Sequence, residues 1–201
     1  MKRTPSAVLA EVYLRCMRGL LIPLTLALAL TACGPQARKY KTDPRLDPLF
    51  TELKAAPDAA SSSVVEARIW RIWAESGSAT VDILLERSQA AEAAGDIQLA
   101  RSLLDQAVQI LPDYAEAYNR RAVLAFSADD RAAAIADIED ALKREPRHFG
   151  ALLGLGTIYE SMNQPKAALE AYKMALEIAP FLEQAKQGVA RLKPQVEGGG
   201  A

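Results

Sequence analysis

The 201-residue sequence is poor in the residues that carry most metal and nucleophile chemistry, since it has one histidine and two cysteines. Transition-metal sites need several such ligands close together. Net charge is also small, because 24 lysines and arginines oppose 25 aspartates and glutamates. Proteins that bind nucleic acid through its phosphates need an excess of positive charge. We therefore expect no metal or other cofactor, no catalytic site, no small-molecule substrate and no nucleic-acid partner.

Aromatic residues are scarce as well, at 6% of the chain, whereas apolar residues reach 50% and alanine is abundant. Aromatic and β-branched residues favour strands, and alanine favours closely packed helices. The composition therefore predicts an all-α fold. The length suits one or two domains.

One long apolar run is present, from Leu20 to Leu30. It has no charge and is too short to cross a bilayer comfortably, which is typical of the central part of a secretory signal. The residues after it, ending at Cys33, resemble the lipobox of bacterial lipoproteins, in which small residues precede the cysteine that receives the lipid. We expect a signal peptide over 1–32, with Met17 as an alternative start, and lipidation at Cys33. An ordinary cleaved signal peptide is the alternative.

Polar residues and prolines follow Cys33, so residues 33–45 are expected to form a flexible tether. Two apolar stripes with helical spacing then predict a helical hairpin over 46–78. The stripes are Leu46, Leu49, Phe50 and Leu53, followed by Val65, Ile69, Ile72 and Trp73. Ser63 and Glu66 have the spacing of a capping box at the start of the second helix. Trp73 is expected in the core and Trp70 at a partly exposed edge.

Three prolines recur at an interval of 34 residues, at Pro112, Pro146 and Pro180. This interval is the period of the tetratricopeptide repeat (TPR), a pair of helices. The frame divides the chain into repeats 81–114, 115–148 and 149–182. It places an alanine at repeat positions 20 and 27, where the two helices cross closely: Ala100 and Ala107, Ala134 and Ala141, and Ala168 and Ala175. The sequence thus resembles TPR proteins, and the resemblance implies a right-handed TPR superhelix.

The segment 183–193 has the pattern of an amphipathic helix, and we expect it to cap the last repeat. The end of a solenoid otherwise exposes apolar surface. Pro194 is expected to stop this helix, which leaves 194–201 as a disordered tail. The hairpin 46–78 is expected to cap the opposite end, so that nine helices form one continuous stack.

Two polar groups could suggest chemistry, and both have a simpler structural interpretation. His148 is the only histidine, so we expect it to cap or hydrogen-bond at a helix start. Asp113 and Glu116 have the spacing of a capping box. A run of carboxylates is expected to form ion pairs four residues apart on an exposed helix face, Glu139 with Lys143 and Asp140 with Arg144.

TPR stacks bind partners on a concave surface that is lined by the first helix of each repeat. Counting positions predicts the groove residues Leu85 and Gln89 in the first repeat, Asn119, Arg120, Val123 and Phe126 in the second, and Leu153, Thr157 and Glu160 in the third. Chaperone-binding TPR proteins grip a C-terminal carboxylate with lysine, asparagine and arginine there, and that clamp is absent. The predicted groove is apolar in the middle and mildly acidic at its edges, so the expected ligand is an apolar or basic peptide.

A lipobox combined with three TPRs resembles the TPR lipoproteins of bacterial cell envelopes. The resemblance implies a non-catalytic scaffold or adaptor with a protein partner. It also implies export and a lipid anchor in the periplasmic face of the outer membrane, with a soluble periplasmic protein as the alternative. A regulatory subunit of an envelope enzyme, an enzyme with an unrecognised site and a self-associating scaffold are the alternative functions.

Overall fold

The computed structural model describes residues 43–198, and these residues form helices with no strand among them. The helices are α2 (Leu46–Lys54), α3 (Ala59–Ala74), α4 (Ala79–Ala93), α5 (Ile97–Ile110), α6 (Ala115–Ser127), α7 (Arg131–Arg144), α8 (Phe149–Ser161), α9 (Pro165–Ile178) and α10 (Glu183–Glu197). No helix of the described part is long and apolar enough to cross a membrane. The predicted signal peptide, the alternative start and the lipidation site at Cys33 lie outside the described residues.

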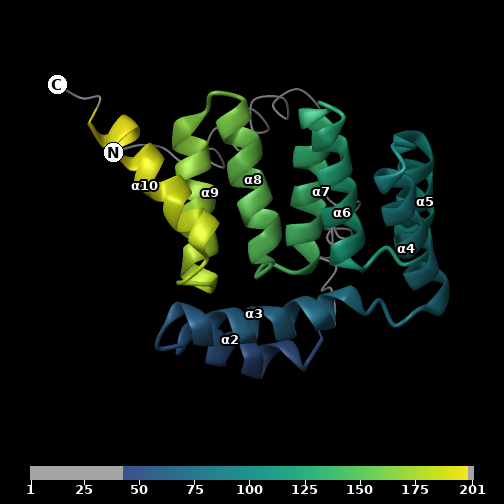
Figure 1. The fold of residues 1–201 in the computed structure, drawn as a ribbon, viewed down its shortest axis with the longest axis horizontal. Coiled ribbons are helices and arrows are strands. Elements are labelled where there is room, and N and C mark those ends of the chain that lie inside the picture. Colours follow the sequence, from purple (N-terminus) through teal and green to yellow (C-terminus); the bar gives the residue numbers. More distant parts are fainter. Residues whose placement is uncertain (1–42, 199–201) are drawn as a thin grey trace, which may run out of the picture. The chain divides into compact units, whose positions relative to one another are not determined.

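Six of these helices form three consecutive hairpins, α4–α5, α6–α7 and α8–α9 (Figure 1). The second helix of each hairpin begins 34 residues after the previous one, at Ile97, Arg131 and Pro165. The turn before it contains a residue with positive φ, namely Gly95 (78°), Asp129 (64°) or Asn163 (55°). Glycine, aspartate and asparagine are the residues that adopt this conformation most readily. A turn residue with positive φ therefore recurs every 34 residues, which is also the interval between the prolines.

The six alanines at repeat positions 20 and 27 are all fully buried, with 0% exposure. They lie where the two helices of a hairpin pack against each other, and a larger side chain would push the helices apart. Position 24 is also buried in every repeat, by Leu104, Ile138 and Tyr172. The all-α TPR fold expected from the sequence is therefore confirmed.

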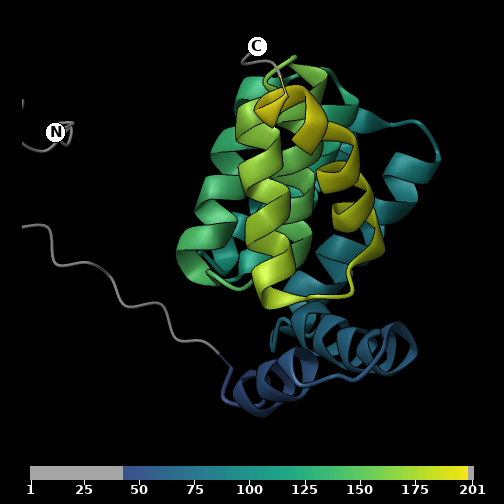
Figure 2. The same cartoon turned by 90° about the vertical axis from the view of Figure 1, so that its left-hand side faces the viewer.

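The N-terminal hairpin, α2–α3, does not extend the stack, and the prediction of nine helices in one continuous stack was wrong. Figures 1 and 2 both show it lying across one end of the repeat helices, with α2 in contact with α9 and α3 in contact with α6. Its apolar stripes share one core cluster with the third repeat, in which Leu53 and Ile69 pack together with Phe149 and Leu169. Phe149, the first residue of α8, contacts this hairpin, with its ring centroid 5.6 Å from that of Trp70 and 5.0 Å from that of Trp73.

Two predicted helix ends also differ from the structure. Helix α3 begins before Ser63, because the side chain of Asp58 accepts a hydrogen bond from the Ser61 N–H at 2.8 Å and caps the helix. The capping box of Ser63 and Glu66 is therefore wrong. Helix α10 continues through Pro194 to Glu197. Proline lacks the N–H that would bond to the carbonyl four residues earlier, and its ring crowds that carbonyl, but its φ is helical, so the last turn can still form at a cost in stability.

Candidate functional site

Two separate hollows contain eight of the nine predicted groove residues. The first, called here the α4–α6 hollow, has a volume of about 310 Å³ and is lined by Leu85, Gln89, Asn119, Arg120 and Val123. The second, the α8–α10 hollow, has a volume of about 490 Å³ and is lined by Leu153, Thr157 and Glu160. Phe126 lines neither hollow, because its ring packs against the core cluster of the second repeat.

The α4–α6 hollow has one wall from outside the repeats. Trp70 of α3 lines it and remains 36% exposed, and Val123 on α6 is 52% exposed. The edge position expected for Trp70 is thus correct, but repeat counting could not assign this residue to the groove because α3 is not part of a repeat. Together with Leu85, these side chains give the hollow an apolar floor and rim.

The α8–α10 hollow includes three residues of the last helix: Gln184, Gln187 and Arg191. If the 34-residue frame is continued beyond residue 182, they occupy the same groove positions 2, 5 and 9 as in the earlier repeats. The guanidinium of Arg191 donates to both carboxylate oxygens of Glu160, at 2.7 and 2.8 Å, and lowers the pKa of Glu160 below its ordinary value. Extending the frame by one helix would have found these residues from the sequence.

A buried carboxylate, Glu116, holds the centre of the site together. Its oxygens accept hydrogen bonds from Asn119 Nδ2 at 2.9 Å and Arg120 Nε at 2.9 Å, and one of them lies 3.2 Å from His148 Nε2. The other ring nitrogen of His148 accepts a hydrogen bond from the Ala151 N–H at 3.1 Å. The proton of the imidazole is therefore on Nε2, which donates to Glu116. His148 caps α8, as expected from the sequence, and both of its nitrogens are already used.

The same contacts correct one prediction and determine the charge of Glu116. The Asp113–Glu116 capping box is wrong, because Tyr114 occupies the N-cap of α6 and makes no side-chain cap, while Glu116 turns inward. Burial raises the pKa of Glu116, but the hydrogen bond from His148 and the hydrogen bond and positive charge of Arg120 outweigh burial, so its pKa lies below the ordinary value. Arg120 is therefore neutralised by Glu116 and offers little charge to a ligand.

Aromatic rings join the N-terminal hairpin to this network. The Trp73 indole stacks on the His148 imidazole, with ring centroids 4.0 Å apart and an angle of 6° between the planes. Trp70 meets His148 and Phe149 edge-on, at 5.6 Å in each case. Gly150 makes room for it, since a Cβ atom there would lie 2.5 Å from the Trp70 ring. The tryptophan thus reaches the groove only because α8 has glycine as its second residue.

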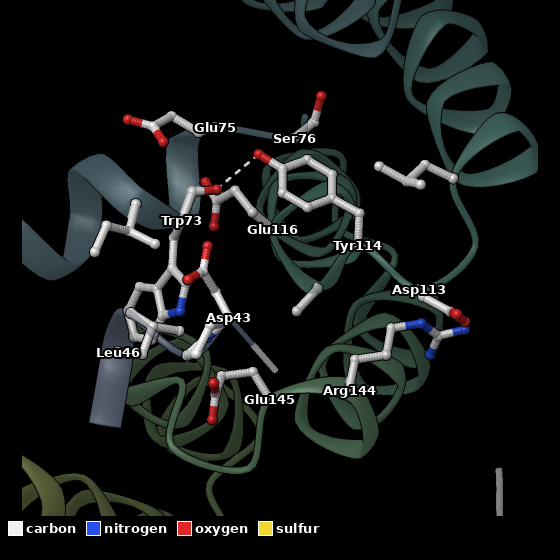
Figure 3. A pocket seen from close by; sticks show the side chains of 14 residues that line it. Asp43, Leu46, Trp73, Glu75, Ser76, Asp113, Tyr114, Glu116, Arg144 and Glu145 are labelled. Carbon is white, nitrogen blue, oxygen red and sulfur yellow. Dashed lines mark hydrogen bonds between the residues drawn. The ribbon is translucent and has the colours of Figure 1, made fainter. Parts of the chain in front are cut away.

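A third cavity, the α3–α6 pocket, is lined by Trp73 and has a volume of about 390 Å³ (Figure 3). The Tyr114 hydroxyl closes one side by donating to the Trp73 carbonyl at 2.7 Å. Its other carboxylates include Asp43 and Glu75, which both bind Arg45, and Glu145, which binds Arg147. These three carboxylates are already paired, and the pocket is also lined by Asp113 and Arg144, which carry opposite charges.

The remaining polar clusters have structural roles. Arg121 of α6 donates to Asp137 of α7 at 2.6 and 2.9 Å and to Asp105 of α5 at 2.8 Å. Asp140 pairs with Arg144 at 3.5 Å, as predicted. The predicted pair of Glu139 and Lys143 was wrong, because Lys143 binds Asp140 instead, three residues away, at 3.2 Å. Within residues 43–198 no cluster of histidine, cysteine, aspartate and glutamate has the arrangement of a metal site.

Sequence comparison finds relatives over most of the described part. A family model described as Tetratricopeptide repeat matches residues 119–183. A TPR repeat-containing protein of Rhizobium etli is 38% identical over 156 residues, which are 77% of this chain and 76% of that protein. The small glutamine-rich tetratricopeptide repeat-containing protein 2 of Saccharomyces cerevisiae is 34% identical over 83 residues, which are 41% of this chain and 24% of the yeast protein.

Solved structures with a similar fold are TPR domains. The Sgt2 TPR domain from Aspergillus fumigatus superposes with a TM-score of 0.56 and 26% identity, over 60% of this chain and 81% of that one. The first TPR of Spaghetti (RPAP3), solved with the HSP90 peptide SRMEEVD, superposes with a TM-score of 0.56 and 17% identity, over 59% of this chain and 94% of that one.

Proposed function

Because this chain belongs to the tetratricopeptide-repeat family, whose fold supports protein–protein interaction scaffolds, we propose that its α4–α6 hollow binds a short peptide segment of a partner protein. The observation that carries this proposal is the pairing of exposed apolar side chains with polar groups in one hollow. Trp70 and Val123 stay exposed beside the buried Leu85, while Gln89 and Asn119 offer amide groups. Apolar walls with a few polar groups are typical of binding sites.

The charge of the hollow defines the kind of peptide. Its ionisable lining residues are Glu92, Glu116 and Arg120. Arg120 is bound to Glu116 at 2.9 Å, whereas Glu92 is exposed and forms no ion pair within residues 43–198. The hollow is therefore mildly acidic, and electrostatic complementarity favours an apolar peptide with basic residues.

An acidic ligand would find few partners in the hollow. The peptide in the Spaghetti complex, SRMEEVD, has three acidic residues. Here Leu85 and Gln89 in the first repeat, and Asn119 and Val123 in the second, occupy positions where the chaperone-binding TPRs described above use cationic and amide side chains. The chain is therefore expected to discriminate against peptides of that kind.

Selection from a random dodecamer peptide library displayed on phage tests this proposal. We expect the enriched peptides to be rich in apolar and basic residues and poor in aspartate and glutamate. The Kd of the best peptides is then measured by fluorescence anisotropy with the unmodified chain and with Val123→Lys, which adds a repelling charge inside the hollow. A loss of affinity of about tenfold or more is expected, equivalent to about 1.4 kcal/mol.

Val64→Lys is the matched control, because Val64 is 61% exposed on α3 and does not line the hollow. It should bind the selected peptides as the unmodified chain does. Enrichment of acidic peptides, no enrichment at all, or equal affinity of the Val123→Lys chain would each contradict the proposal.

We further propose that the protein is exported and held by a lipid on Cys33 at the outer membrane, with the soluble periplasmic form as the alternative. The support is the lipobox resemblance of the residues before Cys33. Mass spectrometry of the protein from bacterial membranes should find a diacylglyceryl-modified N-terminal cysteine, and Cys33→Ser should move the protein to the soluble fraction. A peptide that runs uncleaved through an unmodified Cys33 would contradict this proposal.

A further inference from the structure

The four helices α4, α6, α8 and α10 occupy equivalent places in the 34-residue frame, but one of them, α4, has a face that no other described residues cover. Position 3 is alanine in the last three, and these alanines have 0% exposure: Ala117, Ala151 and Ala185. Position 10 is also buried in the last three, at 2–3% exposure, by Leu124, Ile158 and Leu192. In α4 the equivalent residues are Ile83, which is 55% exposed, and Ala90, which is exposed.

The difference arises from the neighbouring helices. Helices α6, α8 and α10 pack against the second helix of the preceding hairpin, that is α5, α7 and α9. Within residues 43–198 no such helix packs before α4, because the α2–α3 hairpin lies across α6 and α9 instead (Figure 1). Ile83, Arg87 and Ala90 therefore form an uncovered surface, called here the α4 end face. An isoleucine replaces the alanine at the position where the other helices meet a neighbour.

Charge on this surface points to what covers it. At position 7 of the second repeat, Arg121 reaches back to α5 and binds Asp105 at 2.8 Å. Arg87 occupies the same position in the first repeat, is exposed, and has no ion pair within residues 43–198. In α5 the carboxylate is flanked by Leu104 and Val108, which pack into the core cluster shared with α6. A helix that covers α4 in the same way would present a carboxylate to Arg87 and apolar side chains to Ile83 and Ala90.

The opposite end of the stack has a different surface. The exposed residues of α10 are mostly polar or charged: Glu183, Gln184, Gln187, Arg191, Lys193, Gln195 and Glu197. Terminal helices of solenoids need such a polar outer face to remain soluble. Since most exposed residues of α10 are polar or charged, this helix offers little apolar surface to the α4 end face, and head-to-tail association of copies of this chain is not favoured.

We propose that the α4 end face is a second interaction surface, separate from the groove, which binds an amphipathic helix of a partner protein with a carboxylate between its apolar residues. Binding extends the stack by one helix, with the partner's carboxylate paired to Arg87. Helices that dock through an apolar stripe are a common mode of recognition. A paired charge at the edge of such a contact selects the partner and its register more than it adds affinity.

A synthetic peptide of residues 96–112 is the probe, because it contains α5, the helix that covers the equivalent face of α6. A control peptide has Asp105→Lys. Fluorescence anisotropy with the full chain should give a Kd for the first peptide that is about tenfold lower than for the control. The Arg87→Glu chain should instead bind the control peptide more tightly than the first peptide. Ile83→Ser should weaken the binding of both peptides by a similar factor. Ile83 and Arg87 are exposed, so these variants are expected to fold.

Val123→Lys provides the control for the groove and should leave the affinity for the α5 peptide unchanged. This variant also distinguishes the two proposals, because peptides that bind the groove are affected by Val123→Lys and peptides that bind the α4 end face are not. Equal binding of the two peptides, no binding at millimolar concentration, or a loss of binding in the Val123→Lys chain would overturn the proposal. Sedimentation that shows a dimer of the chain alone, broken by Ile83→Ser, would assign the surface to a second copy and overturn it as well.

Discussion

Glu116 shows at the scale of one residue how the candidate site is built. A buried carboxylate is costly unless hydrogen bonds compensate for the water it loses. Here Asn119, Arg120 and His148 supply those bonds, and they come from α6 and from the residue that caps α8. Glu116 lines both the α4–α6 hollow and the α3–α6 pocket. One ionised side chain thus fixes the wall between two cavities.

The stability of the fold should depend on the ionisation of Glu116. Its pKa in the folded chain lies below the ordinary value of 4.5. The ionised form therefore stabilises the fold above about pH 4.5, and this contribution is lost as pH falls towards the lower folded pKa. Glu116→Gln should lower the free energy of unfolding at pH 7 by about 1–3 kcal/mol. It should also flatten the fall in stability between about pH 5 and pH 3, as measured by urea unfolding at a series of pH values.

Glu92→Gln is the control for this experiment, because Glu92 is exposed and lies in the same hollow. The free energy of unfolding of the Glu92→Gln chain should change with pH as that of the unmodified chain does. Parallel curves for the Glu116→Gln and unmodified chains would show that Glu116 does not contribute in this way.

At the scale of the elements, the N-terminal hairpin meets the start of α8 through the tryptophans of α3. Trp70 lies over Gly150, and an added Cβ would be 2.5 Å from its ring. Gly150→Ala is therefore expected to lower the free energy of unfolding by about 1–3 kcal/mol, because the tryptophan must move. Urea unfolding followed by circular dichroism measures the loss. The indole fluorescence of the folded state should change with it.

Gly154 in the same helix is the matched control. A Cβ there would meet the nearest side-chain atom at 3.4 Å, which is close to ordinary contact. Gly154→Ala should be neutral or stabilising, by up to about 1 kcal/mol of helix propensity. If both substitutions have the same effect, the close approach of Trp70 to α8 does not determine the stability of the hairpin contact.

The repeats could be predicted from the sequence because their residues recur at a fixed interval, and small side chains such as Ala100 and Ala134 are required wherever two helices cross. The position of the N-terminal hairpin could not be predicted from the sequence. An apolar stripe such as that of Ile69 and Trp73 shows which face of a helix is buried, but it does not show which surface buries it. The hydrogen-bond partners of a side chain could not be predicted from the sequence either. Asn119 was predicted in the groove from its position, yet no period indicates that its amide binds Glu116.

Among the described residues, the hairpins of the whole molecule are supported unequally. The third repeat shares its core with the N-terminal hairpin and α10, and the second repeat has neighbours on both sides. The first repeat has a core cluster that extends only to α6. Contacts in a solenoid are mostly between neighbours, so a repeat with one neighbour is less stable than a repeat with two.

Hydrogen exchange should therefore be fastest in the first repeat. We expect the amides in the middle of α4 to exchange before those in the middle of α6 and α8, because local opening of α4–α5 breaks a single interface. Mass spectrometry of peptides from a timed exchange experiment measures this order, and α8 serves as the internal reference. Slower exchange in α4 than in α8 would contradict this ranking.

The close packing of Trp70 over Gly150 also limits which of the three hairpins can replace one another in the chain. Only the third begins with Phe149 and Gly150, and the second begins with Ala115 and Glu116. A chimera with its last two hairpins transposed would keep every alanine at the helix crossings, yet it would offer α3 a glutamate where it now meets a glycine. The chain is thus a repeat protein whose units share one architecture but are not equivalent building blocks.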